Sequence, residues 1–230
     1  MHRETIKQGT MAKQKIMFSE RYGLQQGVLA GTKTMTRRIC TMTLHRKQTD
    51  GTIKDIEPDD IFIAHDGVAL FQVGRAGYRV PKENQPRYKV GEEVAIAQPY
   101  KVIAQQHREW LDLQLAANGQ YIGDLMDAGG WENKMFVRSF YCPNNIRIKS
   151  IKAERLQCIS DEDIMREGIM EGEFMNTWDR FYYDEWGDVA NHITFRTPRL
   201  AFASLINKIS GKGTWERNPW VYAYEFELTP

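Results

Sequence analysis

The sequence predicts an α+β fold, mainly β, in a single elaborated domain. The final stretch, residues 220–228, alternates large apolar positions with small or charged ones, as a strand does. Capping residues precede apolar stretches at Ser19, Ser160 and Thr197, which is typical of helix starts. No internal repeat or linker divides the chain, so these elements are expected to share one core.

The N-terminal part is expected to give a short strand and a short helix. Residues 1–14 are expected to be a disordered leader, with Met11 as an alternative start, and residues 15–230 to form the domain. The apolar run 15–18 predicts a strand. Ser19 is then placed as the cap of a helix that Gly31 ends. Its buried stripe is formed by Leu24, Val28 and Leu29.

Three polar or aromatic stretches are interpreted as insertions, at about 41–87, 103–141 and 171–196. The first contains apolar runs around Asp66-Gly67, which predict a hairpin. The second contains a helix over 107–117 and a glycine-rich loop over 119–132. The third is rich in aromatic residues, which either stack on bases or form a miniature core. These residues are Trp178, Phe181, Tyr182, Tyr183, Trp186 and Phe195.

Between the insertions the chain predicts further strands and helices. Residues 92–97 alternate as a strand, and Ile146, Ile148 and Ile151 mark another whose outward face is basic. Ser160 starts a helix that stops at Gly168. Thr197-Pro198 starts a helix that Gly211 ends. That last helix is expected to bury Phe202, Leu205, Ile206 and Ile209.

The run Gly31–Arg38 carries the clearest chemistry. It holds three cations and three hydroxyls directly after the first helix, and is interpreted as a polar loop outside the core. A lysine three positions before a threonine can meet it when the backbone curls, and neighbouring arginines can hold an anion. This pattern suits a phosphate, a nucleobase or an acyl group. The alternative is an ordinary solvated surface.

Four ordered motifs resemble the ASCH domain family, in its longer phage- and prophage-associated form. They are IMFSERYGLQQGVLAGTKTMTRRI, YKVGEEVAIA, NNIRIKSIKAERLQCISDEDIMREGI and GKGTWERNPWVYAYEFEL. The resemblance implies a PUA-like antiparallel β-barrel with peripheral helices and loop insertions. It also implies a nucleoside- or RNA-related function, since small members of the family are amidohydrolases that remove the acetyl group from N4-acetylcytidine.

Carried over residue by residue, the resemblance assigns catalysis to Lys33, Thr36 and Glu167, and Thr34, Arg37 and Arg38 are expected to bind substrate. A threonine hydroxyl needs a base to take its proton, and Lys33 serves as one only if its pKa falls. Glu167 could then relay a proton to the leaving amine. The chain would be a linear amide C–N hydrolase.

One motif departs from the family, and alternatives stay open. Where longer members have Arg-Glu-Thr/Ser-Trp, this chain has Ala97-Gln98-Pro99-Tyr100, which puts activity in doubt. The alternative function is a non-catalytic module for RNA or a modified nucleotide. In a further interpretation, separate from that choice, Lys33 and Thr36 only organise the loop. Arg37 and Arg38 would instead pair with acidic residues, for which Glu92, Glu93 and Asp161 are the candidates.

The composition further restricts the ligands, cofactors and location that we expect. A net charge of +1 argues against a non-specific polyanion binder. Cys40, Cys142 and Cys158 are far apart and the histidines show no ligand spacing, so neither a metal nor another cofactor is expected. No apolar run is long enough for a membrane span, and a cytoplasmic location is expected.

Overall fold

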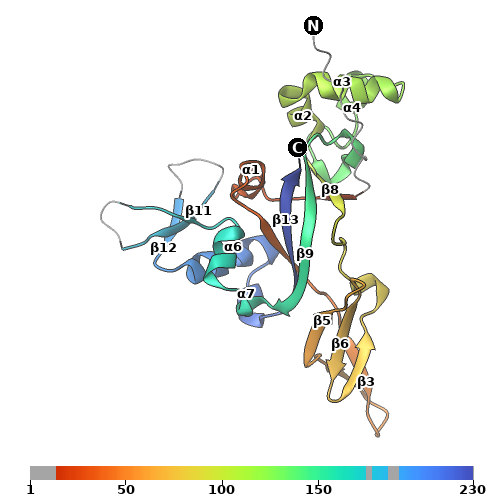
Figure 1. Cartoon of the computed structure of the whole chain (residues 1–230), viewed down its shortest axis with the longest axis vertical. Helices are drawn as coiled ribbons and strands as arrows, with labels where there is room; N and C mark the ends of the chain where they lie inside the picture. The colour runs from red at the N-terminus through yellow and green to blue at the C-terminus, as the bar shows by residue number, and fades with distance from the viewer. Residues whose placement is uncertain (1–13, 175–177, 186–191, 230) are drawn as a thin grey trace. The chain divides into compact units, whose positions relative to one another are not determined.

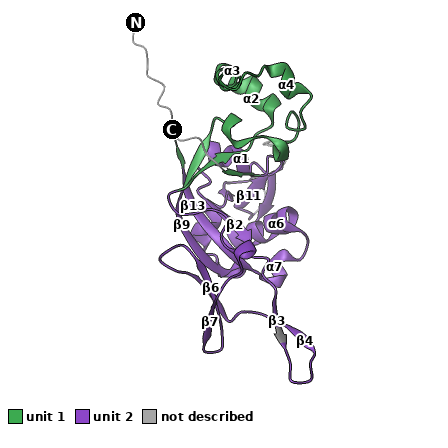
Figure 2. Ribbon diagram, turned by 90° about the vertical axis from the view of Figure 1, so that its right-hand side faces the viewer, with its two compact units in different colours: residues 1–18, 92–147, 228–230 green, residues 19–91, 148–227 purple. Residues whose placement is uncertain are grey.

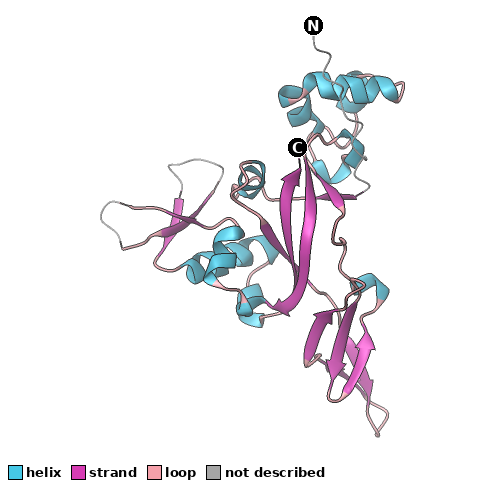
Figure 3. Ribbon diagram, in the orientation of Figure 1, coloured by secondary structure: helices cyan, strands magenta, loops and turns pink. Residues whose placement is uncertain are grey.

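The computed structural model describes residues 14–174, 178–185 and 192–229. Within these residues the chain has thirteen strands and seven α-helices. Figure 3 shows the mixed α+β character of the chain. It divides into two compact units (Figure 2), each described here by itself. Unit 1 comprises residues 1–18, 92–147 and 228–230, and unit 2 comprises residues 19–91 and 148–227. The prediction of one domain stays a prediction.

Unit 1 combines a small sheet with a helical segment. β1 (Gln14–Ile16) pairs in parallel with β8 (Glu93–Ile96), which pairs antiparallel with the first residues of β9 (Asn145–Arg155). The strands predicted near residues 15 and 92 are therefore present. The parallel pairing was not predicted, because neighbouring strands distant in sequence leave no local signal of direction.

The predicted insertion at 103–141 is mostly helical. It contains α2 (Tyr100–Gln106), α3 (Arg108–Ala117) and α4 (Ile122–Met126), followed by 3₁₀ turns at Lys134–Phe136 and Ser139–Tyr141. The helix expected over 107–117 is confirmed as α3. The expected loop over 119–132 contains α4, which a capping box between Tyr121 and Asp124 stabilises. Tyr100, Leu111 and Tyr141 belong to the buried core of this segment.

Unit 2 is built on long antiparallel strands. β9 runs beside β13 (Trp220–Thr229), as Figure 1 shows, and β13 pairs antiparallel with β2 (Met35–Ile39). β9 alternates as predicted, with Ile148 buried and Lys149 exposed. The described strands form open sheets, and none of these sheets closes into a barrel.

The insertion at 41–87 forms two small sheets. β3 (Leu44–Lys47) pairs with β4 (Ile53–Ile56), and a second sheet contains β5 (Asp60–Ile63), β6 (Ala69–Val73) and β7 (Ala76–Arg79). β5 and β6 are the predicted hairpin around Asp66-Gly67. A 3₁₀ turn follows at Lys82–Asn84.

The aromatic insertion forms a small sheet that packs on a helix. β10 (Met170–Glu171), β11 (Phe181–Asp184) and β12 (His192–Phe195) pair antiparallel. Tyr183 is fully buried, stacks on Phe195, and its hydroxyl contacts Ser204 of α6. These contacts are those of a miniature core. Trp178 is 86% exposed, and Trp186 lies outside the described residues.

Capping residues start two helices of unit 2 as predicted. Ser160 caps α5 (Asp161–Arg166) through its hydroxyl, and Thr197 caps α6 (Pro198–Ser210). A short α7 (Thr214–Arg217) follows, and Leu156–Cys158 forms a 3₁₀ turn. The prediction that α6 buries Ile209 is wrong: this side chain is 41% exposed at the end of the helix.

The first helix begins later than predicted. α1 (Leu24–Leu29) starts after Gly23, which has a left-handed φ of 65° and occupies the cap position assigned to Ser19. Ser19 instead accepts two backbone hydrogen bonds through its carbonyl, from Leu24 and Gln25. The turn over residues 20–23 therefore separates the strand of unit 1 from the helix. Among the described helices, none is long and apolar enough to cross a membrane.

Candidate functional site

Lys33 lies in a tight turn after α1. The amides of Thr32 and Lys33 both donate to the carbonyl of Gly27, at 2.9 and 3.0 Å. A side chain at position 27 would meet the Lys33 Cβ atom at 3.3 Å, so a glycine allows this close approach. The turn directs Lys33 inward, and the residue is only 2% exposed.

The ammonium group of Lys33 has three acceptors. Its Nζ atom donates to the carbonyl oxygens of Met35 and Glu167, both at 2.6 Å, and to Oε2 of Glu167 at 2.7 Å. A lysine has three N–H donors, so all of them are used. Lys33 and Glu167, which are 134 positions apart, form an ion pair that is closed to solvent.

Glu167 is positioned by the end of α5. Its amide donates to the carbonyls of Asp163 and Ile164, and Gly168 turns the chain with a φ of 104°. The Glu167 residue is 5% exposed. Because its backbone carbonyl and its carboxylate both accept from Lys33, a single ammonium group fixes both ends of this residue.

Arg37 connects three carboxylates. Its Nη1 donates to Glu167 at 3.0 Å, its Nη2 to Asp163 at 3.0 Å, and both Nε and Nη2 donate to Glu154, at 2.9 and 2.6 Å. The Arg37 side chain is 1% exposed. The acidic partners considered from sequence, Glu92, Glu93 and Asp161, are therefore wrong for Arg37.

Further ion pairs surround this centre. Lys152 donates to Asp163 at 2.8 Å, and Arg166 donates to Glu225 at 2.6 Å and to the hydroxyl of Thr34 at 3.1 Å. We call the eight charged residues the charge cluster. Its cations are Lys33, Arg37, Lys152 and Arg166, and its carboxylates are Glu154, Asp163, Glu167 and Glu225. Positive and negative groups balance, which is how buried charges are tolerated.

The remaining predicted residues lie in or beside β2. Thr36 is opposite Tyr224 and Arg38 opposite Tyr222 in the pairing of β2 with β13. Neighbouring residues of a strand point to opposite faces, so Thr36 and Arg38 project away from the face on which Arg37 joins the charge cluster. The structure thus brings Lys33, Arg37 and Glu167 together, and it places Thr36 and Arg38 on the other face.

The position of these residues differs from the expected polar loop. Thr36, Arg37 and Arg38 belong to a strand, and Lys33 and Thr36 are both buried. The run contains few apolar residues, and such a composition is typical of a loop. Burial is possible because carboxylates from β9 and α5 neutralise the cations.

Burial and charge act against each other on the titrating groups. Burial lowers the pKa of Lys33, and the attraction of Glu167 only partly opposes this effect. For Glu167, burial favours the neutral acid, but the charges of Lys33 and Arg37 outweigh it and hold the pKa below its usual value. The pKa of Asp163 is lowered in the same way, against burial, by Lys152 and Arg37.

Sequence reasoning did not single out Glu154 or Asp163 as site residues. Asp163 was interpreted as a first-turn residue of α5, where the helix dipole stabilises acidic side chains. Glu154 lies on β9. Their signal was present in the spacing: Asp163 and Glu167 are four apart and share one side of a helical turn. No grouping of three metal-ligating side chains occurs in the described parts of the chain.

The variant motif at Ala97-Gln98-Pro99-Tyr100 lies in unit 1. Gln98 is 1% exposed and its side chain accepts from Asn144 at 3.2 Å. Tyr100 begins α2.

Comparisons of the chain with protein-family models, with curated proteins and with solved structures give no match. The resemblance to ASCH domains therefore stays a prediction.

Proposed function

We propose that residues 15–230 form a single PUA-like ASCH domain that hydrolyses the acyl amide of an N4-acylated cytidine-type nucleoside. The observation that supports this most strongly is the buried contact between Lys33 and Glu167. The family resemblance assigned both residues to catalysis from separate motifs. The two residues are 134 positions apart in the sequence and meet in the fold.

The chemistry assigned to the pair is proton transfer. Thr36 follows Met35, whose carbonyl accepts from Lys33, but strand alternation directs the Thr36 side chain to the opposite face of β2, so the proposed reaction requires the Thr36 hydroxyl to move to Lys33 when substrate binds. In the proposed reaction the Thr36 oxygen attacks the acyl carbon. Lys33 passes a proton to Glu167 and takes the proton of the threonine in its place. The lowered pKa of Lys33 favours this exchange.

The remaining steps return the site to its starting state. As the amide C–N bond breaks, Glu167 and Lys33 return one proton to the leaving exocyclic amine, which departs as the free nucleoside. Water then hydrolyses the acyl ester on Thr36 and releases the carboxylic acid. Arg37 keeps Glu167 ionised between turnovers, because its guanidinium donates to the same carboxylate.

The test uses Thr36, since its hydroxyl can be removed without disturbing the charge cluster. Thr36→Val keeps the shape and burial of the side chain, whereas Thr36→Ser keeps the hydroxyl. We expect the wild type and Thr36→Ser to release cytidine from N4-acetylcytidine, followed by chromatography, and Thr36→Val to lose nearly all of this activity. Equal release by Thr36→Val would refute the role of Thr36.

A complete lack of release by the wild type, over a panel of acylated nucleosides, would refute the hydrolase. In that case binding of a modified nucleoside without turnover, or of RNA, becomes the better account. Salt separates these two ligands, because each phosphate contact steepens the loss of RNA affinity with salt and a nucleoside has no phosphate.

A further inference from the structure

Unit 1 contains a cavity that is independent of the charge cluster. It has a volume of about 210 Å³ and lies in the helical segment between α2, α4 and the 3₁₀ turn at Ser139–Tyr141. It is smaller than the pockets of roughly 300–1,000 Å³ that hold drug-sized ligands. The cavity therefore fits only a small molecule. Its lining includes Tyr100, Leu125, Ala128, Phe136 and Tyr141.

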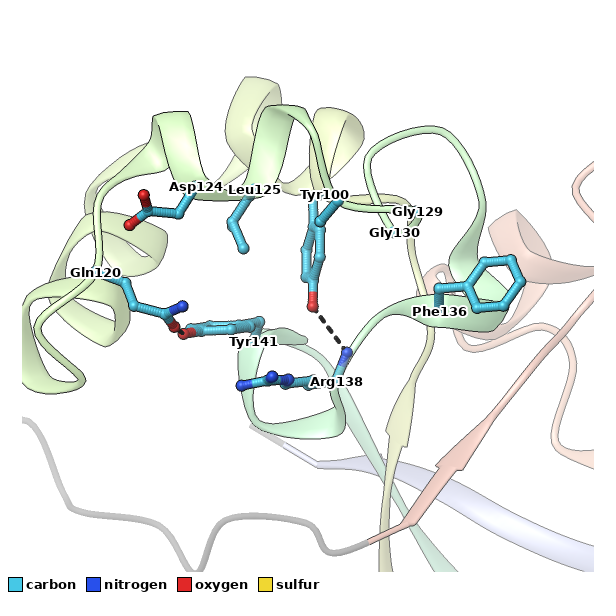
Figure 4. A pocket seen from close by; sticks show the side chains of 10 residues that line it. Tyr100, Gln120, Asp124, Leu125, Gly129, Gly130, Phe136, Arg138 and Tyr141 are labelled. Carbon is cyan, nitrogen blue, oxygen red and sulfur yellow. Dashed lines mark hydrogen bonds between the residues drawn. The ribbon is translucent and has the colours of Figure 1, made fainter.

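The lining of the cavity also carries both signs of charge. Figure 4 shows Asp124 above Gln120, and Arg138 beneath Tyr141. The hydroxyl of Tyr141 bonds to the Gln120 side chain, and both Arg138 and Asp124 act electrostatically on the pKa of that tyrosine, which burial raises. Both charges thus lie within electrostatic range of the same hydroxyl.

These two charges do not neutralise one another. Both side chains are exposed to solvent, and within the part of the chain that the structure describes neither Arg138 nor Asp124 forms an ion pair, while the Arg138 guanidinium lies 6.0 Å from the centre of the Phe140 ring. Asp124 accepts from the amide of Tyr121 through Oδ2 only. Some charged groups of this unit are paired, such as Arg108 with Asp112 and Lys101 with Glu132. A separated guanidinium and carboxylate in the cavity lining is complementary to a ligand that carries both charges.

The rest of the wall includes apolar and aromatic side chains as well as backbone at Gly129 and Gly130. A Cβ atom at Gly130 would meet the Tyr100 ring at 2.5 Å, so only a glycine fits there. The Tyr100 hydroxyl accepts from the Arg138 amide at 3.0 Å, which fixes the start of the arginine side chain (Figure 4). Leu125 and Ala128 offer an apolar surface beside the ring.

We propose that this cavity binds a zwitterionic α-amino acid with an apolar side chain. Arg138 binds the α-carboxylate, since a guanidinium forms strong paired hydrogen bonds with that group. Asp124 binds the α-ammonium group. The side chain of the ligand lies against Leu125, Ala128 and the Tyr100 ring.

Calorimetric titration of the whole chain tests the proposal without any mutation. The probes are L-leucine, N-acetyl-L-leucine, which lacks the ammonium charge, and L-leucinamide, which lacks the carboxylate. Hydrogen bonds to charged groups are the stronger ones, so each derivative is expected to bind at least about tenfold more weakly than leucine. No binding of leucine, equal binding of the three, or binding of cytosine in place of leucine would overturn the proposal.

Two variants then assign the charges. Arg138→Gln should lower the affinity for leucine at least about tenfold. It should change the affinity for leucinamide little, because leucinamide has no carboxylate that could bind Arg138. Asp124→Asn keeps an acceptor for the Tyr121 amide. It should lower the affinity for leucine and leave the affinity for N-acetyl-leucine nearly unchanged. Arg108→Gln is the control, since Arg108 does not line the cavity. Affinities that both variants leave unchanged would also overturn it.

Discussion

Lys33 shows how a charged residue becomes part of a core. All three of its hydrogens are donated, two to backbone carbonyls and one to a carboxylate, within 2.6–2.7 Å. An unpaired ion at such a depth would be expensive, whereas a paired one with its hydrogen bonds complete is tolerated. The stability of unit 2 therefore depends on both members of the pair.

Replacing one member should destabilise the protein strongly. Lys33→Met leaves Glu167 buried without its ammonium partner, and we expect the free energy of unfolding to fall by about 3–5 kcal/mol. Urea denaturation measures this change. The double variant Lys33→Met with Glu167→Gln should recover part of the loss, because no carboxylate is then left unpaired. A surface control, Arg108→Gln, should have little effect. A Lys33→Met protein as stable as the wild type would contradict the pairing.

Acid should weaken the protein through the same carboxylates. The pKa values of Glu167, Asp163 and Glu225 are lowered in the folded state. Their contribution to stability is therefore complete above the ordinary values of 4.5 and 3.8, and it is lost as the pH falls through the lower folded values. Urea unfolding at a series of acidic pH values should show this loss. Glu167→Gln should make the free energy of unfolding depend less steeply on pH in this acidic range. An unchanged slope in this variant would argue against the role of Glu167.

At the scale of elements, α5 determines where the carboxylates lie. Ser160 caps its first turn, Asp163 faces Arg37 and Lys152 from that turn, and Glu167 closes the last one. Gly168 then leaves the helix at a φ of 104°, and its Cα is so close to Leu24 that an added Cβ would lie 3.0 Å from that side chain.

Gly168→Ala should therefore be costly. The backbone conformation is one that residues with a Cβ rarely adopt, and we expect a loss of about 1–3 kcal/mol in the free energy of unfolding, measured with urea. Gly123→Ala is the matched control, because Gly123 lies within α4 with open space around it and alanine is the better helix former. A Gly168 variant that unfolds like the Gly123 variant would show that the turn is not strained.

Elements with local signals were predictable, and those that depend on distant partners were not. Residues close together in the sequence determine three of these features: the cap at Ser160, the proline start of α6 and the hairpin at Asp66-Gly67. The strand that contains Thr36 and Arg37 exists because β13 pairs with it, almost 190 positions later. In the same way, the meeting of Lys33 and Glu167 was expected only from resemblance, whereas Glu154 became visible only in the structure.

At the scale of the whole molecule, the net charge is close to zero, and the basic residues of β9 also form ion pairs with nearby carboxylates. The basic face predicted on β9 is neutralised within each unit: Arg147 pairs with Glu93 in unit 1, and Lys149 with Glu227 in unit 2. Lys152 belongs to the charge cluster. This face of β9 therefore offers a polyanion few uncompensated cations.

We therefore expect weak RNA binding with a shallow salt dependence. Fluorescence polarisation of a labelled single-stranded RNA, titrated with the protein at several salt concentrations, gives the slope directly. Each phosphate contact would add roughly 0.7 to its magnitude. A steep slope with tight binding would contradict this expectation and favour the RNA-binding alternative. Glu227→Gln, which releases Lys149, should increase the affinity.

The long separation within the Lys33–Glu167 pair also bears on synthesis. Glu167 is made 134 residues after Lys33, which at typical translation speeds of 5–20 residues per second is a delay of about 7–27 s. Until then the nascent segment carries an ammonium group that cannot be buried without a partner. Unit 2 can therefore complete its fold only after α5 has been synthesised, and until then the nascent segment around Lys33 stays open to chaperones and proteases.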